Sequence, residues 1–164
     1  MNNWLFLSLL LAHVIGDFYL QNDKYCTQKR KGIQSWFLYV HSLVIGGMSW
    51  VAVPVYDFGF YALAIAFSHL VIDIIKTYSP KGLWSFVIDQ IVHWAILIIV
   101  TSSFDTTTKL PIQSMDCNSS FSIPLFILAI LLCIKPANIL IKLVLKNIKL
   151  EKHNPVKTSK MQER

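Results

Sequence analysis

Seven ionisable side chains lie within the apolar segments of this chain, and they are of types that bind metal ions. They are four histidines and three aspartates: His13, Asp17, His41, His69, Asp73, Asp89 and His93. Neutral imidazole nitrogens and carboxylate oxygens are common ligands of Zn²⁺, Mn²⁺ and Fe²⁺. A metal site with an open position can also activate water for hydrolysis. These residues therefore predict a divalent metal site, with zinc as the first choice and manganese or iron as alternatives.

Six of the seven side chains form pairs spaced four residues apart, namely His13/Asp17, His69/Asp73 and Asp89/His93. Because a helix completes a turn in about 3.6 residues, both members of each pair should lie on one helix face. Taken alone, each pair is equally well explained by a hydrogen bond within one helix. A lone buried histidine such as His41 is more often an ordinary core residue than a ligand. Three pairs together with His41 favour a metal or catalytic site.

The segments that carry these residues are long enough to cross a bilayer. Hydrophobic residues make up 54% of the 164 residues and occur in runs of about twenty. We predict an all-α, polytopic membrane protein with about five transmembrane helices, near residues 4–20, 36–55, 58–78, 83–101 and 121–134. The Lys135-Pro136 step should break or kink the fifth helix, and residues 137–150 have the pattern of an amphipathic interfacial helix. Residues 1–150 then form the transmembrane helical domain, and residues 151–164 form a polar tail expected to be disordered.

The basic residues predict how the helices are oriented. Fourteen of the fifteen lysines and arginines fall on one side of the predicted membrane, and only Lys109 falls on the other. By the positive-inside rule, the N-terminus is outside and the C-terminus is in the cytoplasm. The net charge of +6 is thus explained by topology, and we expect no nucleic-acid partner.

This orientation places all seven ionisable side chains in the inner halves of their helices, at one depth toward the cytoplasm. The agreement is informative because the topology was derived from the lysines and arginines alone. A charged side chain at the centre of a membrane helix costs about 2.5–3.5 kcal/mol. A common depth therefore favours one shared site in which the charges offset one another.

The chemistry of such a site assigns a role to each residue. Seven ligands exceed the four of a tetrahedral ion, so either two ions bind or some side chains orient the ligands. One aspartate that does not bind metal would act as a general base, the candidates being Asp17, Asp73 and Asp89. Three more side chains could bind substrate and stabilise charge on its leaving group: Gln21, Lys76 and Gln90. Lys76 could instead extend its ammonium to the membrane interface.

Several strings in the chain resemble a known family. AHVIGDFYLQ (residues 12–21), His41, SHLVIDIIK (68–76), DQIVHW (89–94) and KPANILI (135–141) occur in the order and spacing of a bacterial membrane family catalogued as domain of unknown function 3307. This resemblance covers about residues 5–145 and implies a bacterial inner-membrane protein. The SHLVID string is also similar to inner-membrane proteins described as predicted metal-dependent hydrolases, in which His and Asp likewise lie within transmembrane helices.

We therefore expect an inner-membrane metal-dependent hydrolase. Its substrate would be a lipid or a lipid-linked phosphate or ester that enters from the cytoplasmic leaflet, so membrane lipids are its expected partners. One alternative is a transporter or relay for metal ions or protons, which would need a polar path to both sides of the membrane. The outer halves of the predicted helices are almost wholly apolar. A second alternative is a non-catalytic membrane protein in which the polar cluster is structural.

Overall fold

The computed structural model describes residues 3–20, 32–80, 82–104 and 122–152, and every regular element in these ranges is helical. The prediction of an all-α protein is confirmed. In chain order the elements are α1 (Asn3–Val14), the π-helical turn η1 (Ile15–Tyr19), the 3₁₀ turn η2 (Gly32–Gln34), α3 (Trp36–Ala52), the 3₁₀ turn η3 (Tyr56–Phe58), α4 (Gly59–Tyr78), α5 (Leu83–Ser103), α7 (Ser122–Ile134) and α8 (Pro136–Lys152).

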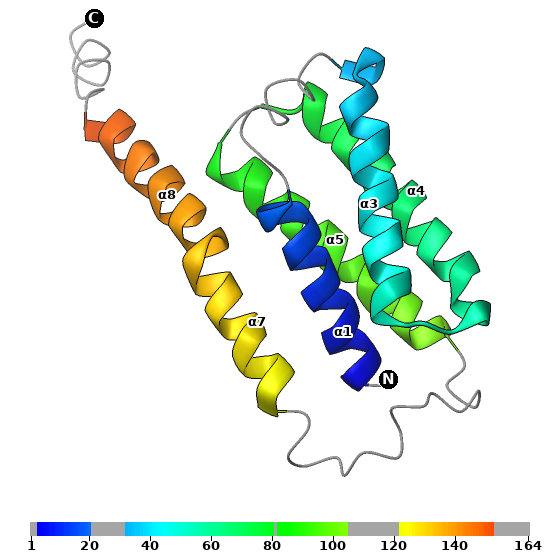
Figure 1. Cartoon of the computed structure of the whole chain (residues 1–164). Coiled ribbons are helices and arrows are strands. Elements are labelled where there is room, and N and C mark those ends of the chain that lie inside the picture. The colour runs from blue at the N-terminus through cyan, green and yellow to red at the C-terminus, as the bar shows by residue number, and fades with distance from the viewer. Residues whose placement is uncertain (1–2, 21–31, 81, 105–121, 153–164) are drawn as a thin grey trace, which may run out of the picture.

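Helices α1, α3, α4 and α5 pack as a bundle in which consecutive helices run in opposite directions, and α7 and α8 lie along one side of it (Figure 1). In the part of the chain that the structure describes, three helical stretches are long and apolar enough to cross a membrane: Tyr56–Tyr78, Leu83–Ser103 and Ile123–Ile148. The stretches Asn3–Tyr19 and Trp36–Ala52 are apolar but shorter. The described residues thus contain five apolar helical stretches, while the number of membrane crossings stays a prediction.

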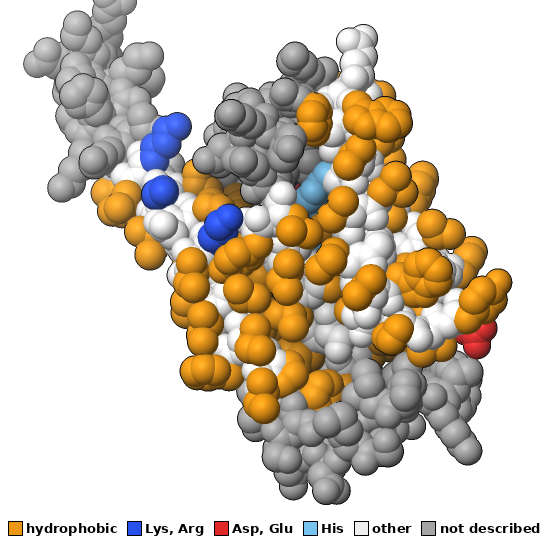
Figure 2. Space-filling model, viewed as in Figure 1, with side chains coloured by type: hydrophobic (Ala, Val, Ile, Leu, Met, Phe, Trp, Pro, Cys, Tyr) orange, Lys and Arg blue, Asp and Glu red, His pale blue; other side chains and the backbone are white. Residues whose placement is uncertain are grey.

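The outer surface of the bundle is largely apolar. Exposed hydrophobic side chains cover most of the described face in Figure 2, and residues such as Phe60, Phe67 and Ile99 are more than half exposed. A soluble protein rarely exposes so large a continuous apolar surface. The surface instead suits contact with lipid chains, as the membrane prediction requires.

The last helical stretch is interrupted only at Lys135, the residue before Pro136. Lys135 forms a turn between α7 and α8, and its backbone N–H still donates to the Leu131 carbonyl at 3.5 Å. Proline is well accommodated in the first turn of a helix, so α8 begins at once. The predicted C-terminal helix is therefore present as α8, but it continues in nearly the direction of α7 (Figure 1). Of the predicted tail, residues 153–164 lie outside the described residues.

Lys135 also fastens the α7–α8 junction to the end of the first helical stretch. Its ammonium donates to the Phe18 carbonyl at 3.0 Å and lies 5.0 Å from the centroid of the Tyr19 ring. In return, the Tyr19 hydroxyl donates to the Leu131 carbonyl at 2.7 Å. These contacts hold η1, which carries Asp17, against the long helical stretch.

We expect Lys135→Met to destabilise the protein by about 1–3 kcal/mol, because it removes a charge-assisted hydrogen bond and a cation–π contact. Lys142→Met, at an exposed position of α8, is the matched control and should change stability little. Unfolding by sodium dodecyl sulfate in mixed micelles measures both. Equal unfolding midpoints for the two variants would show that the contacts of Lys135 contribute nothing to stability.

The core on one side of the ionisable residues is built mostly from apolar side chains. It includes Leu5, Leu9, Ile45, Ile65, Leu97 and Phe104. Two buried hydroxyls lie among them, but Ser49 donates to the Ile45 carbonyl at 2.9 Å and Thr101 to the Leu97 carbonyl at 2.7 Å. Each hydroxyl is thus satisfied within its own helix, and no polar chain crosses this half of the described bundle.

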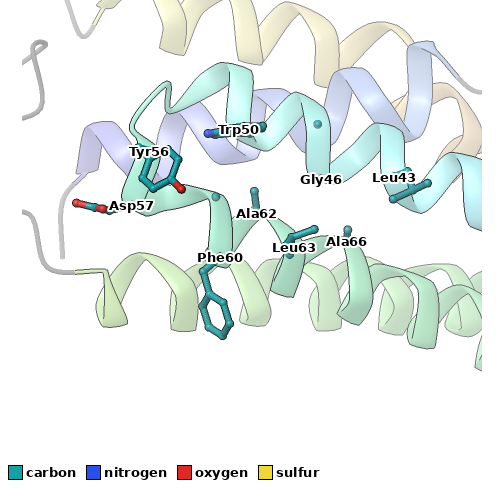
Figure 3. Close-up of a pocket in the computed structure, with 11 residues that line it drawn as sticks. Leu43, Gly46, Trp50, Tyr56, Asp57, Phe60, Ala62, Leu63 and Ala66 are labelled. Atoms are coloured by element: carbon teal, nitrogen blue, oxygen red, sulfur yellow. The ribbon is translucent and has the colours of Figure 1, made fainter.

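Helices α3 and α4 approach each other closely at Gly46. A Cβ atom at this position would lie 2.7 Å from the Ala66 Cβ and 3.0 Å from the Ala62 carbonyl oxygen. Figure 3 shows Gly46 on α3 facing these two alanines of α4, along a groove with a volume of about 670 Å³. This close approach positions His41 of α3 beside His69 of α4.

Candidate metal centre

The bundle brings the seven predicted ionisable side chains together in its interior. Helix α1 carries His13, η1 carries Asp17 and α3 carries His41. Helix α4 carries His69 and Asp73, and α5 carries Asp89 and His93. Every one is largely buried: the exposed fraction runs from 1% at His69 to 9% at His41, and is 8% for the Asp17 side chain. The antiparallel helices therefore bring these residues into one cluster, and its depth toward the cytoplasm stays a prediction.

The closest group consists of Asp17, His41 and His69. One ligand atom from each of them lies within 4.8 Å of the others, a spacing that could hold a metal ion. The His41 Nε2 atom is 3.2 Å from Asp17 Oδ1, and the His69 Nε2 atom is 4.0 Å from the same oxygen. Asp73 Oδ2 completes the group, at 3.9 Å from His41 Nε2 and 3.7 Å from His69 Nε2. We call these four residues the metal group.

The rings of the other two histidines, His13 and His93, pack against His69 and against each other, and the centroids of His13 and His69 are 5.7 Å apart. The His93 ring centroid is 4.4 Å from that of His69 and 5.0 Å from that of His13. His93 Nδ1 is 2.7 Å from the Asp89 backbone carbonyl, which only accepts hydrogen bonds, so Nδ1 carries the proton and the neutral ring presents a lone pair at Nε2. Within the described residues, His93 Nε2 and His13 Nε2 are buried without a hydrogen-bond partner.

A polar chain leads from Lys76 to the metal group. The Lys76 ammonium forms an ion pair with Asp89 Oδ2, and the Lys76 side chain stays 38% exposed. The Gln90 amide donates to the same Asp89 oxygen at 3.1 Å and to Asp17 Oδ2 at 3.4 Å. Gln90 therefore links the ion pair to Asp17. Gln21, the third predicted substrate-binding residue, lies outside the described residues.

The donors fit a divalent cation in number, type and charge. The carboxylates of Asp17, Asp73 and Asp89 against the single ammonium of Lys76 leave a formal charge of −2 when the imidazoles are neutral. Such a charge is costly in a membrane, and one divalent ion would neutralise it. His69 Nε2, which faces the Asp17 and Asp73 carboxylates, is buried and has no hydrogen-bond partner in the described part of the chain, so its lone pair could bind a cation. Zinc suits this mixture of nitrogen and oxygen donors.

The position of Asp17 depends on a feature that the spacing argument missed. Residues Ile15–Tyr19 form a π-helical turn, in which the Leu20 N–H donates to the Ile15 carbonyl at 3.0 Å. A π turn contains more residues than an α turn and therefore rotates Asp17 away from a regular continuation of α1; such turns are frequent at functional sites. Gly16 lies against the Ile45 side chain of α3, and a Cβ there would lie 2.4 Å from Ile45 Cδ1, so a larger residue would require this side chain to move. The only sequence signal for this turn is the glycine directly before Asp17.

Fold and site together define a helical protein with apolar helices of membrane-spanning length and a buried His/Asp cluster that could hold a metal ion. The family described as "Protein of unknown function (DUF3307)" matches residues 5–121. Because the match covers more than half of the chain, this protein belongs to that family. The match includes the whole cluster but ends before the KPANILI string at residues 135–141. No curated protein and no solved structure matches the chain.

Proposed function

We propose that this protein is a metal-dependent hydrolase of the bacterial inner membrane, with one divalent ion, most simply zinc, held by Asp17, His41, His69 and Asp73. The observation that carries the proposal is the convergence of ligand atoms from three separate helical segments within 4.8 Å. Residues from η1, α3 and α4 meet there although apolar side chains dominate all three. A second support is the charge of −2, which one such ion offsets.

A bound divalent ion supplies a Lewis acid that polarises a phosphoryl or carbonyl oxygen and acidifies water. The remaining steps, proton transfer and stabilisation of the substrate's charge, fall to residues around the ion. Asp89 Oδ1 is buried and has no hydrogen-bond partner among the described residues, so it is the carboxylate oxygen best placed to accept a proton. The Lys76 ammonium, paired with the other Asp89 oxygen, supplies positive charge for an anionic substrate or leaving group. Gln90 donates hydrogen bonds to both Asp89 and Asp17 and so fixes the two carboxylates relative to each other.

The surroundings of the site suggest a lipid or lipid-linked phosphate or ester as substrate. A site enclosed by membrane helices is reached most directly by molecules already in the bilayer. Lys142 and Lys146 are exposed on α8, and their neighbour Asn147 lines the same cavity as Lys76. By the positive-inside rule, this end of the bundle faces the cytoplasm, with the N-terminus outside.

A transporter or relay would need polar groups on the far side of the cluster as well. The described core on that side is apolar, and its two buried hydroxyls bond to their own helices. Apart from these two hydroxyls, the described residues of this half therefore offer no buried polar side chains to bind an ion as it crosses the membrane. This favours a site that opens to one leaflet, as a hydrolase requires.

The experiment is a metal analysis combined with a turnover assay. Protein purified in mild detergent without chelators should contain about one divalent ion per chain by inductively coupled plasma mass spectrometry. Incubation with a bacterial lipid extract should then release phosphate or fatty acid, and this release should stop with a chelator and return with zinc. Folded protein without stoichiometric metal would refute the metal centre. Metal without turnover of any lipid would refute the hydrolase and leave a structural site.

A further inference from the structure

A cavity on the lipid-facing side of the bundle opens beside the Lys76–Asp89 ion pair. It has a volume of about 540 Å³, within the range of sites that bind small molecules. The C-terminal end of α4 and the first half of α5 form most of its wall, and Asn147 of α8 closes one side. Most of this wall is apolar, including Ile72, Ile75, Trp84, Ile88 and Val92.

The two members of the ion pair differ in how they meet this cavity. The Lys76 side chain is 38% exposed, whereas the Asp89 side chain is 3% exposed. A molecule in the cavity can therefore reach the lysine, while the aspartate stays behind it. Lys146, the residue before Asn147 on α8, is also exposed, although it does not line the cavity. An apolar wall with the accessible ammonium of Lys76 at one end complements an anionic amphiphile.

We propose that this cavity seats an anionic phospholipid, whose phosphate binds Lys76 and whose acyl chain lies along Ile72, Ile88 and Val92. This inference rests on the proposed function and narrows its substrate class to phospholipids with a net negative headgroup. From the phosphate, the contacts run through Asp89 and Gln90 to Asp17 of the metal group. The headgroup would thus be bound within a few side chains of the reacting centre.

The test uses two photoactivatable lipids with a diazirine in the acyl chain, one phosphatidylglycerol and one phosphatidylcholine. Each is mixed at equal low density into phosphatidylcholine vesicles that contain the full-length protein, and labelled peptides are identified by mass spectrometry. We expect the phosphatidylglycerol probe to label the α4–α5 peptides about fivefold more than the phosphatidylcholine probe, the ratio that one lysine typically gives. Lys76→Gln should reduce this ratio to about one.

Two tryptophan substitutions on α5 distinguish specific lipid binding in the cavity from nonspecific contact of lipid with the helix surface. Ile88 lines the cavity and Ile99 does not, and the two are 57% and 63% exposed. They lie about three turns apart on the same helix face. Ile88→Trp should fill the cavity and abolish the preferential labelling, while Ile99→Trp should leave it unchanged.

Equal labelling by both probes in the wild-type protein, or equal effects of the two tryptophans, would show ordinary lipid contact and overturn the inference. Metal content measured on the same samples keeps the two proposals apart. Metal-loaded protein without a lipid preference would refute the phospholipid-binding cavity but not the metal centre. Metal-free protein with Lys76-dependent labelling would reject the metal centre and retain the lipid seat.

Discussion

Asp17→Asn is expected to remove the bound metal and to reduce hydrolysis to the level of chelated protein. Asp17 Oδ1 faces both His41 Nε2 and His69 Nε2, and its Oδ2 accepts from Gln90, so this carboxylate joins the two halves of the site. An amide keeps the shape but loses the negative charge that binds the cation. Because changes to residues behind the ligands already cost about 10–100-fold in metal affinity, loss of a ligand should cost more.

The matched control is Asp57→Asn, the same chemical change at an exposed position in η3. It should retain wild-type metal content and turnover. Metal content by mass spectrometry and a zinc titration of the stripped protein provide the measurements. Because replacing a buried charge could also disturb folding, His41→Gln, which keeps a polar side chain of similar length, is measured in parallel. Full metal retention in both site variants would rule out the assigned ligands.

Gly46→Leu is expected to prevent α3 and α4 from packing and to give little monodisperse protein. Even a single Cβ at this position meets Ala66 Cβ at 2.7 Å and a backbone oxygen of Ala62 at 3.0 Å, and backbone cannot move aside as a side chain can. Gly46→Ala should be the milder form, destabilising by about 1–3 kcal/mol as overpacked cores do. Any protein recovered should bind metal weakly, because His41 and His69 come from the two separated helices.

Gly47→Leu provides the comparison, since a Cβ at Gly47 meets nothing within 4 Å. It should behave as wild type in size-exclusion chromatography and in unfolding by sodium dodecyl sulfate. The two glycines are adjacent, so helix propensity and local sequence are nearly the same for both substitutions. If both variants were equally stable, the close approach of α3 and α4 would not limit the fold.

Local spacing predicted two of the three pairs on one helix face. His69 and Asp73 lie 3.7 Å apart, and His93 Nδ1 lies 3.8 Å from Asp89 Oδ1. Both pairs lie within regular α-helix, where four residues are close to one turn. For His13 and Asp17 the same spacing spans the junction of α1 with a π turn, so the simple rule does not describe it. Gly16 of that turn lies against the Ile45 side chain of α3, a contact between helices that a local sequence pattern does not contain.

By itself, the sequence determined the helical class, the ionisable residues inside the apolar segments and their common level, because these follow from composition, periodicity and the placement of basic residues. Tertiary structure alone decided which of them meet. It placed Asp17 between two histidines of other helices and turned Lys76 toward Asp89. It also continued α8 from α7 across Pro136. The physical reason is that contacts between helices depend on how each helix is rotated and how closely two helices approach. Here Gly46 allows the close approach of α3 and α4 and the π turn rotates Asp17, and neither effect follows from the sequence of one helix alone.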